Sequence, residues 1–73
     1  MTSDRKEITL QINGKPCTCL AQTHLPEMLK QIGLNPRLVA VEYNGEILPR
    51  QYWDETKLQS GDRLEIVTIV GGG

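Results

Sequence analysis

The sequence is poor in aromatic residues, in cysteine and in histidine. It has no Phe, one Trp and two Tyr, so a hydrophobic core must come from Ile, Leu and Val. Two Cys and one His cannot supply the set of about four ligands that a structural zinc site needs. No arrangement of Ser, Cys or Asp around His24 indicates a nucleophile for it to activate. We therefore expect no metal site and no catalytic residue, with His24 on the surface where a helix begins.

The sequence also lacks blocks of like charge and long apolar runs. Eight Lys and Arg stand against nine Asp and Glu, for a formal net charge of -1, with both signs scattered. This distribution offers no phosphate-binding stripe, which argues against nucleic acid and anionic membranes as partners. No segment reaches the length of a transmembrane span, and the N-terminal MTSDRKE lacks the apolar core of a secretory signal. We expect a cytoplasmic protein.

The chain is short, with 73 residues. A domain of this size buries only roughly 60% of the surface that its unfolded chain exposes, which makes a deep enzymatic cleft hard to build. We expect a single domain over residues 1–73, in which residues 1–5 fray and residues 71–73 form a flexible C-terminal tail.

A β-hairpin is predicted at the N-terminus. Apolar and polar residues alternate from Glu7 to Ile12, and Asn13-Gly14 follows at once. Both turn residues tolerate the positive φ of a type I′ turn, so a second strand should begin at Lys15. A two-residue loop also fixes the cross-strand pairs, which are Ile8 with Cys19, Leu10 with Cys17 and Ile12 with Lys15. We therefore expect both cysteines to be buried and unreactive, as small apolar residues.

A helix and further strands are predicted after the hairpin. Leu25, Met28, Leu29 and Ile32 recur at helical spacing, and we expect Thr23 to be the N-cap, Pro26 to lie in the first turn and Gly33 to end the helix. The other predicted segments are a strand over 38–43, a turn at Asn44-Gly45, a short strand over 46–48, an irregular crossover over 50–59 with Trp53 and Leu58 inward, and a strand over 63–69. This order predicts an α+β unit with a mixed sheet and the helix across one face.

The last predicted strand is apolar on both faces near its end. Leu64 and Ile66 share one face, whereas Val67 and Ile69 share the other face with Glu65. Such a strand is either central in the sheet with partial cover, or it carries a docking surface at Val67 and Ile69 that leads toward the tail. The two interpretations are compatible. For Asp62 and Glu65, a turn and a solvated strand face are sufficient explanations.

Three glycines at the end of the sequence have no structural role. The other four of the seven glycines have turn or cap positions, whereas Gly71, Gly72 and Gly73 follow the last strand. The alternative explanations are a cloning scar or a passive flexible end, and the position of the three glycines argues against both. Residues without a Cβ can be threaded through a narrow channel, and a terminal glycine presents an unhindered carboxylate. Such an end suits capture by the active site of another protein.

These features together resemble the sulfur carrier proteins of thiamine biosynthesis, in the ubiquitin-like β-grasp superfamily. The resemblance is carried by INGK at the first turn, AVEYNGEILPRQYW at 40–53, LQSGDRLEIV at 58–67 and the terminal VGGG. It implies a β-grasp fold with a mixed sheet of four to five strands and one main helix. It also implies that the chain is a protein cosubstrate and not an enzyme.

The resemblance further implies a set of partners. A separate activating enzyme uses ATP to adenylate the carboxylate of Gly73, and the carrier itself binds no cofactor. Sulfur from a donor such as a cysteine desulfurase then gives a thiocarboxylate, which thiazole synthase consumes. Val70, Gly71 and Gly72 would be the tail that these partners bind. Cys17 and Cys19 match no reactive residue of the family.

Three alternatives share parts of this pattern. The small subunit of molybdopterin synthase also ends in Gly-Gly and carries a thiocarboxylate, but PRQYW and the short length fit the thiamine carriers better. A ubiquitin-like modifier would use an activated glycine to form an isopeptide bond with a lysine. A plain β-grasp interaction module would need no Gly-Gly end. The tail disfavours the module, and it cannot by itself separate sulfur transfer from conjugation.

Overall fold

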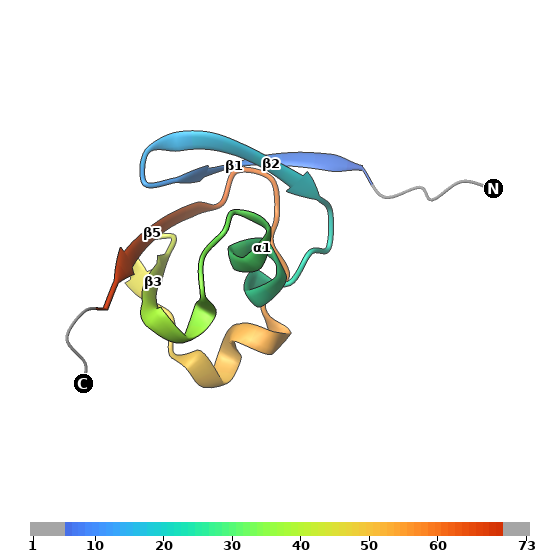
Figure 1. The fold of residues 1–73 in the computed structure, drawn as a ribbon. Helices are drawn as coiled ribbons and strands as arrows, with labels where there is room; N and C mark the ends of the chain where they lie inside the picture. The colour runs from blue at the N-terminus through green and yellow to red at the C-terminus, as the bar shows by residue number, and fades with distance from the viewer. Residues whose placement is uncertain (1–5, 70–73) are drawn as a thin grey trace.

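A five-stranded mixed sheet wraps around one helix (Figure 1). The fold is known from a computed structural model that describes residues 6–69; the predictions for residues 1–5 and 70–73 lie outside that range. The elements are β1 (Glu7–Ile12), β2 (Lys15–Leu20), α1 (Leu25–Gln31), η1 (Pro36–Leu38), β3 (Val39–Tyr43), β4 (Glu46–Ile47), η2 (Arg50–Glu55) and β5 (Arg63–Thr68). The predicted α+β architecture is confirmed.

The last strand, β5, is the central strand of the sheet. The spatial order is β2-β1-β5-β3-β4, with β5 parallel to β1 and antiparallel to β3. α1 covers one face of this sheet, and the core lies between them (Figure 1). The core consists of Leu10, Cys19, Leu25, Met28, Leu29, Val39, Val41, Trp53, Leu58, Leu64 and Ile66. The opposite face of the sheet carries no helix among residues 6–69.

The N-terminal hairpin has the predicted register. Ile8 pairs with Cys19, Leu10 with Cys17 and Ile12 with Lys15, around a turn whose Asn13 and Gly14 both have positive φ. The prediction that both cysteines are buried is wrong for Cys17, which is half-buried, whereas Cys19 is 7% exposed. Cys17 lies on β2, the edge strand of the sheet, whereas its partner Leu10 lies on β1, one strand further in, and is buried.

The ends of α1 differ in how well their caps were predicted. His24, half-buried, is the N-cap and makes no side-chain capping bond, so the prediction of Thr23 is wrong. The Thr23 hydroxyl instead donates to the Leu20 carbonyl at 2.7 Å, because Thr23 is buried in the preceding turn. At the other end Gly33 has φ +88° as predicted, and the amides of Gly33 and Leu34 donate to the carbonyls of Lys30 and Leu29 in a Schellman motif.

The crossover between β4 and β5 begins with a 3₁₀-helix, η2, where the sequence predicted irregular structure. The expected inward positions of Trp53 and Leu58 are confirmed. The Arg50 guanidinium lies 4.7 Å from the centre of the Trp53 ring and donates to the carbonyls of Pro36, Arg37 and Val39. These bonds connect η2 to η1 and to the start of β3. Short 3₁₀-helices have no apolar period, so sequence periodicity does not reveal them.

Candidate functional site

The candidate docking residues lie on the uncovered face of the sheet. Leu64 and Ile66 point into the core, whereas Val67 is 63% exposed and Ile69 is 49% exposed. The predicted alternation along β5 is thus confirmed. The tail residues Val70, Gly71, Gly72 and Gly73 lie outside the described residues. Val67 on β5 and Ile69 directly after it therefore place two exposed apolar side chains at the last described part of the chain, shortly before those glycines in the sequence.

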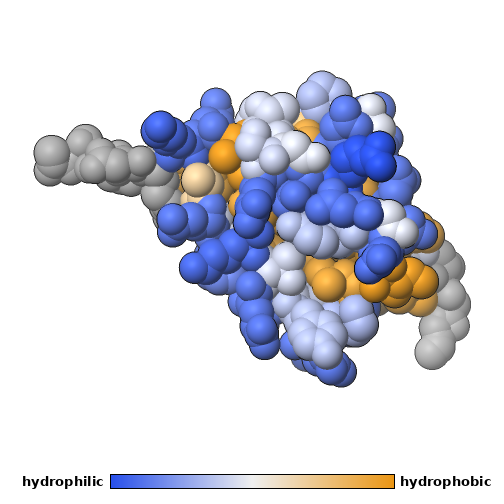
Figure 2. Space-filling view, turned by 180° about the vertical axis from the view of Figure 1, so that it is seen from behind, coloured by the Kyte–Doolittle hydropathy of each residue, from blue (hydrophilic) through white to orange (hydrophobic). Residues whose placement is uncertain are grey.

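Neighbouring strands extend this exposed apolar surface. Ala40 on β3 lies directly opposite Val67, and Glu42, two residues further along β3, lies opposite Ile47 on β4. Residues two apart on a strand share a face, so the side chains of Ala40, Glu42, Ile47 and Val67 lie on the same face of the sheet. Ile47 is 77% exposed, the largest exposure among the exposed large apolar side chains. We call Ala40, Ile47, Val67 and Ile69 the apolar patch. Figure 2 shows apolar side chains gathered at the end of the sheet where β5 finishes.

A shallow hollow lies within this surface. It has a volume of about 300 Å³ and is lined by Ala40, Val41, Glu42, Ile47, Glu65 and Val67. Exposed apolar surface beside a hollow is typical of a protein-protein contact and costs free energy if water covers it. Ile47 was not among the predicted docking residues, although the two-residue turn at Asn44-Gly45 predicts its position opposite Glu42 by the same rule as in the first hairpin.

Both Asn-Gly turns hold β5 through their asparagine side chains. The Ile66 amide donates to Asn13 Oδ1 at 2.7 Å, and Asn13 Nδ2 donates to the Ile66 carbonyl at 3.2 Å. On the other side of β5, the backbone amide of Arg63 donates to Asn44 Oδ1 at 2.8 Å. The backbone amide of Asn44 in turn donates to the Arg63 carbonyl at 2.7 Å. β1 pairs with β5 only as far as Leu64, so the Asn13 side chain extends the hydrogen bonding two residues further along β5, to Ile66.

A buried carboxylate fixes the turn before β5. Asp62 lies at the predicted turn, yet it is only 8% exposed, so its carboxylate is part of the buried structure. It accepts hydrogen bonds from Tyr43 Oη at 2.6 Å, from the Gln59 amide at 2.8 Å and from Asn44 Nδ2 at 3.2 Å. Burial of Tyr43 and its bond to the Asp62 carboxylate raise the pKa of Tyr43 to about 12. These contacts position β5 and leave the Asp62 carboxylate fully engaged.

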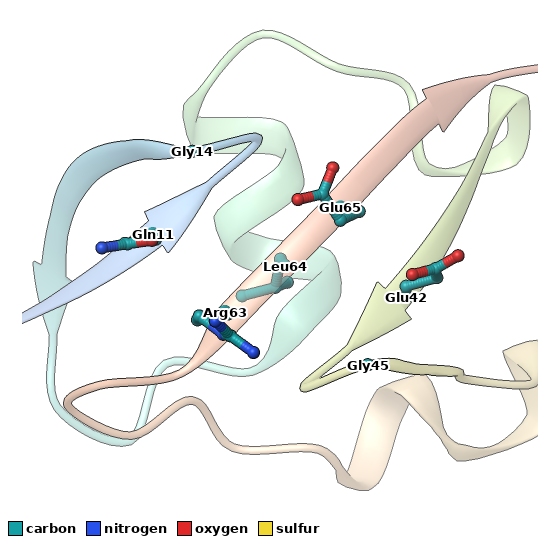
Figure 3. Close-up of a pocket in the computed structure, with 7 residues that line it drawn as sticks. All are labelled: Gln11, Gly14, Glu42, Gly45, Arg63, Leu64 and Glu65. Carbon is teal, nitrogen blue, oxygen red and sulfur yellow. The ribbon is translucent and has the colours of Figure 1, made fainter.

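Charged side chains lie beside the apolar patch. Glu42 and Glu65 are direct cross-strand partners, and Arg63 lies two residues before Glu65 on the same strand face. Figure 3 shows a second hollow at this place, of about 290 Å³, lined by Gln11, Gly14, Glu42, Gly45, Arg63, Leu64 and Glu65.

The described residues 6–69 contain no cluster of three or more His, Cys, Asp or Glu that could hold a metal ion. Within the same range, no helix has the length and apolar character needed to cross a membrane.

The chain matches the ThiS family over residues 10–73. It is 37% identical over 65 residues to the sulfur carrier protein ThiS of Bacillus subtilis (strain 168). The matched region covers 88% of this chain and 98% of that protein. It is also 38% identical over 68 residues to the uncharacterized protein ycf40 of Porphyra purpurea, which covers 93% of this chain and 96% of the relative.

Two further similarities concern a longer protein and a solved structure. A segment that makes up 20% of the thiazole synthase of Paramagnetospirillum magneticum is 39% identical to 64 residues of this chain, or 88% of its length. The crystal structure of ThiS from Geobacter metallireducens matches with a TM-score of 0.75 and 36% identity, over 90% of this chain and 100% of that one. The chain therefore belongs to the ThiS family of sulfur carrier proteins of thiamine biosynthesis, and its sheet and helix form the β-grasp fold of that family.

Proposed function

We propose that this chain carries sulfur for thiazole formation as a thiocarboxylate on Gly73. The observation that carries the proposal is that the family match covers residues 10–73 and therefore includes the three consecutive glycines Gly71, Gly72 and Gly73. In this proposal the chain is a protein cosubstrate. It supplies the reacting carboxylate and the surface by which partner enzymes recognise it, whereas those enzymes supply the catalytic groups.

The proposed chemistry begins with activation, because a free carboxylate is a poor electrophile. A separate adenylating enzyme joins the Gly73 carboxylate to the α-phosphate of ATP, which releases pyrophosphate. A persulfide on a donor such as a cysteine desulfurase then attacks the acyl carbon and displaces AMP, which gives an acyl disulfide. A thiol reduces the S–S bond of this intermediate and is itself oxidised to a disulfide, which releases the thiocarboxylate and the donor thiol. The resulting thiocarboxylate is the form that thiazole synthase consumes. ATP is bound by the activating enzyme and not by the carrier.

The fold supports this division of labour. The apolar patch gives partners a surface to bind, and β5 is fixed on both sides by the Asn13 and Asn44 side chains. A rigid strand defines where the tail, Val70 to Gly73, starts relative to a docked enzyme. Two relatives named thiazole synthase contain a segment similar to this chain within a longer protein, which supports thiazole synthase as a partner.

Truncation of the tail by one residue tests the proposal. Deletion of Gly73 moves the terminal carboxylate back by roughly 3.5 Å and leaves every described contact in place. We expect it to abolish thiocarboxylate formation while folding and docking stay nearly unchanged. Gly72→Val tests the threading step, since a branched side chain should clash in a channel that accepts only glycine.

Two results of these experiments would contradict the proposal. One is sulfur transfer at the normal rate by the chain that lacks Gly73. The other is recovery of the sulfur on Cys17 or Cys19 of the wild-type chain. Ladders of higher-mass conjugates, formed after activation, would favour a ubiquitin-like modifier instead.

A further inference from the structure

Two glutamates lie directly opposite each other on the open face of the sheet. Glu42 on β3 and Glu65 on β5 are direct partners, and both side chains are exposed. Side chains in this relation have Cβ atoms about 4.5–5.5 Å apart, so two negative charges here repel each other. In Figure 3 the Glu65 side chain points away from Arg63, the nearest cation along the same strand. Like charges directly opposite each other do not favour strand pairing.

The two carboxylates cannot be avoided by a partner that binds the apolar patch. Glu42 and Glu65 line both hollows on this face, the apolar one of about 300 Å³ and the polar one of about 290 Å³. Contact with Ala40 and Val67 therefore also removes water from the pair. An apolar partner surface would leave two desolvated like charges without compensation, which is strongly unfavourable.

We propose that the partner of this face presents an arginine or lysine side chain to Glu42 and Glu65, flanked by apolar side chains that fill the hollow over Ala40 and Val67. The inference rests on the proposed function, because it takes the adenylating enzyme as that partner. This enzyme must hold the chain that follows β5, and the patch extends from Val67 on β5 to Ile69, the residue directly after that strand. A guanidinium fits especially well, since it can donate to two carboxylates in fixed directions.

The charges also disfavour the other obvious occupant, a second copy of this chain. A two-fold contact through the same face would bring four carboxylates together, two from each copy. In such a contact each copy would set Arg63 of the same face against its own two carboxylates and those of the other copy, so the charges would not balance. A partner of different sequence can present a basic side chain that compensates the charges of Glu42 and Glu65. The attraction between this basic side chain and the pair would also speed association at low salt.

The test uses three charge-neutralising variants of the full chain. They are Glu42→Gln, Glu65→Gln and the double variant, with Glu27→Gln as the matched control. Glu27 is exposed on α1, across the sheet from the pair, and its replacement changes the net charge equally. Affinity for the purified adenylating enzyme is measured by calorimetry at low and high salt, and the melting temperature is measured on the free chain.

We expect each single variant to bind roughly tenfold more weakly and the double variant to lose most of the salt dependence. The control should bind within about twofold of wild type. The free Glu42→Gln and Glu65→Gln chains should melt at or above the wild-type temperature, because the repulsion is gone. Weaker binding together with equal or greater stability separates a lost contact from a damaged fold.

Unchanged or tighter binding of the double variant would overturn this inference while leaving the proposed sulfur transfer intact. A wild-type dimer that Val67→Glu dissociates would assign the face to a second copy and would also overturn it. Conversely, a wild-type chain that docks with the expected charge dependence but gains no thiocarboxylate would support the inference and contradict the proposed function.

Discussion

Asn13 and Ile66 lie 53 positions apart in the sequence and are joined by two hydrogen bonds, one in each direction between the amide side chain and the backbone. This contact extends the ladder of the parallel pair β1-β5 beyond its last backbone pair, Ile12 with Leu64. It holds β5 two residues before Thr68, the last residue of that strand. A turn residue in the first hairpin thereby fixes the strand from which the C-terminal tail departs.

Loss of the Asn13 side chain should destabilise the domain. Glycine accepts the positive φ of this position, so Asn13→Gly removes the two bonds without adding backbone strain. Each bond contributes about 0.5–1.5 kcal/mol, so we expect the two together to account for a loss of about 1–3 kcal/mol in the free energy of unfolding in urea. Asn13→Asp keeps the acceptor for the Ile66 amide and should lose less. An unchanged urea midpoint for Asn13→Gly would show that the contact is dispensable.

Tyr43 should make stability fall at alkaline pH. Its pKa rises from 10.0 to about 12 on folding, so the folded state favours the neutral phenol. The stabilisation is complete below pH 10 and is lost as the pH rises through about 12. We expect the wild-type free energy of unfolding to fall faster over this interval than that of Tyr43→Phe. Parallel pH profiles would contradict the assignment, because all other titrating groups are shared.

The two cysteines should react at different rates. Cys17 is half-buried, whereas Cys19 is buried and its pKa is raised, mainly by burial. Both effects slow attack by the Cys19 thiolate on a labelling reagent. Native labelling followed by peptide mass analysis should therefore show modification at Cys17 first, with Cys19 reacting only after denaturant is added. Equal native rates would contradict this placement of the two thiols.

Val67→Glu should weaken docking without unfolding the domain. The side chain is 63% exposed, and such surface substitutions usually change stability by less than about 0.5 kcal/mol. Leu64→Ala on the opposite face of the same strand is the contrasting variant, with an expected loss of about 2–5 kcal/mol. Circular dichroism and affinity for the adenylating enzyme are measured for both. If Val67→Glu unfolds the chain, the residue belongs to the core and not to a docking surface.

The predictable parts of the fold are those that local rules determine. The Asn13-Gly14 turn sets the whole register of the first hairpin, and period-2 alternation separates Leu64 and Ile66 from Val67 and Ile69. The β3-β5 register depends on contacts distant in sequence, so the sequence did not show that Glu42 faces Glu65.

Side-chain roles that depend on distant partners were also missed. Asp62 looked like an ordinary turn residue because its donors, Tyr43 and Asn44, come from another hairpin. Thr23 is of a residue type favoured at N-caps, yet its hydroxyl donates to the Leu20 carbonyl in the preceding turn. In each case the residue type predicts that the side chain forms hydrogen bonds, whereas the identity of the partner depends on the tertiary structure.

The most direct test of the account is the intact mass of the chain after incubation with the adenylating enzyme, ATP and a sulfur source. The account predicts a mass increase equal to the exchange of one oxygen for one sulfur, located by fragmentation at Gly73, and present only when ATP is included. A chain of unchanged mass under conditions in which the enzyme activates a known carrier would contradict it, as would sulfur located at any other residue.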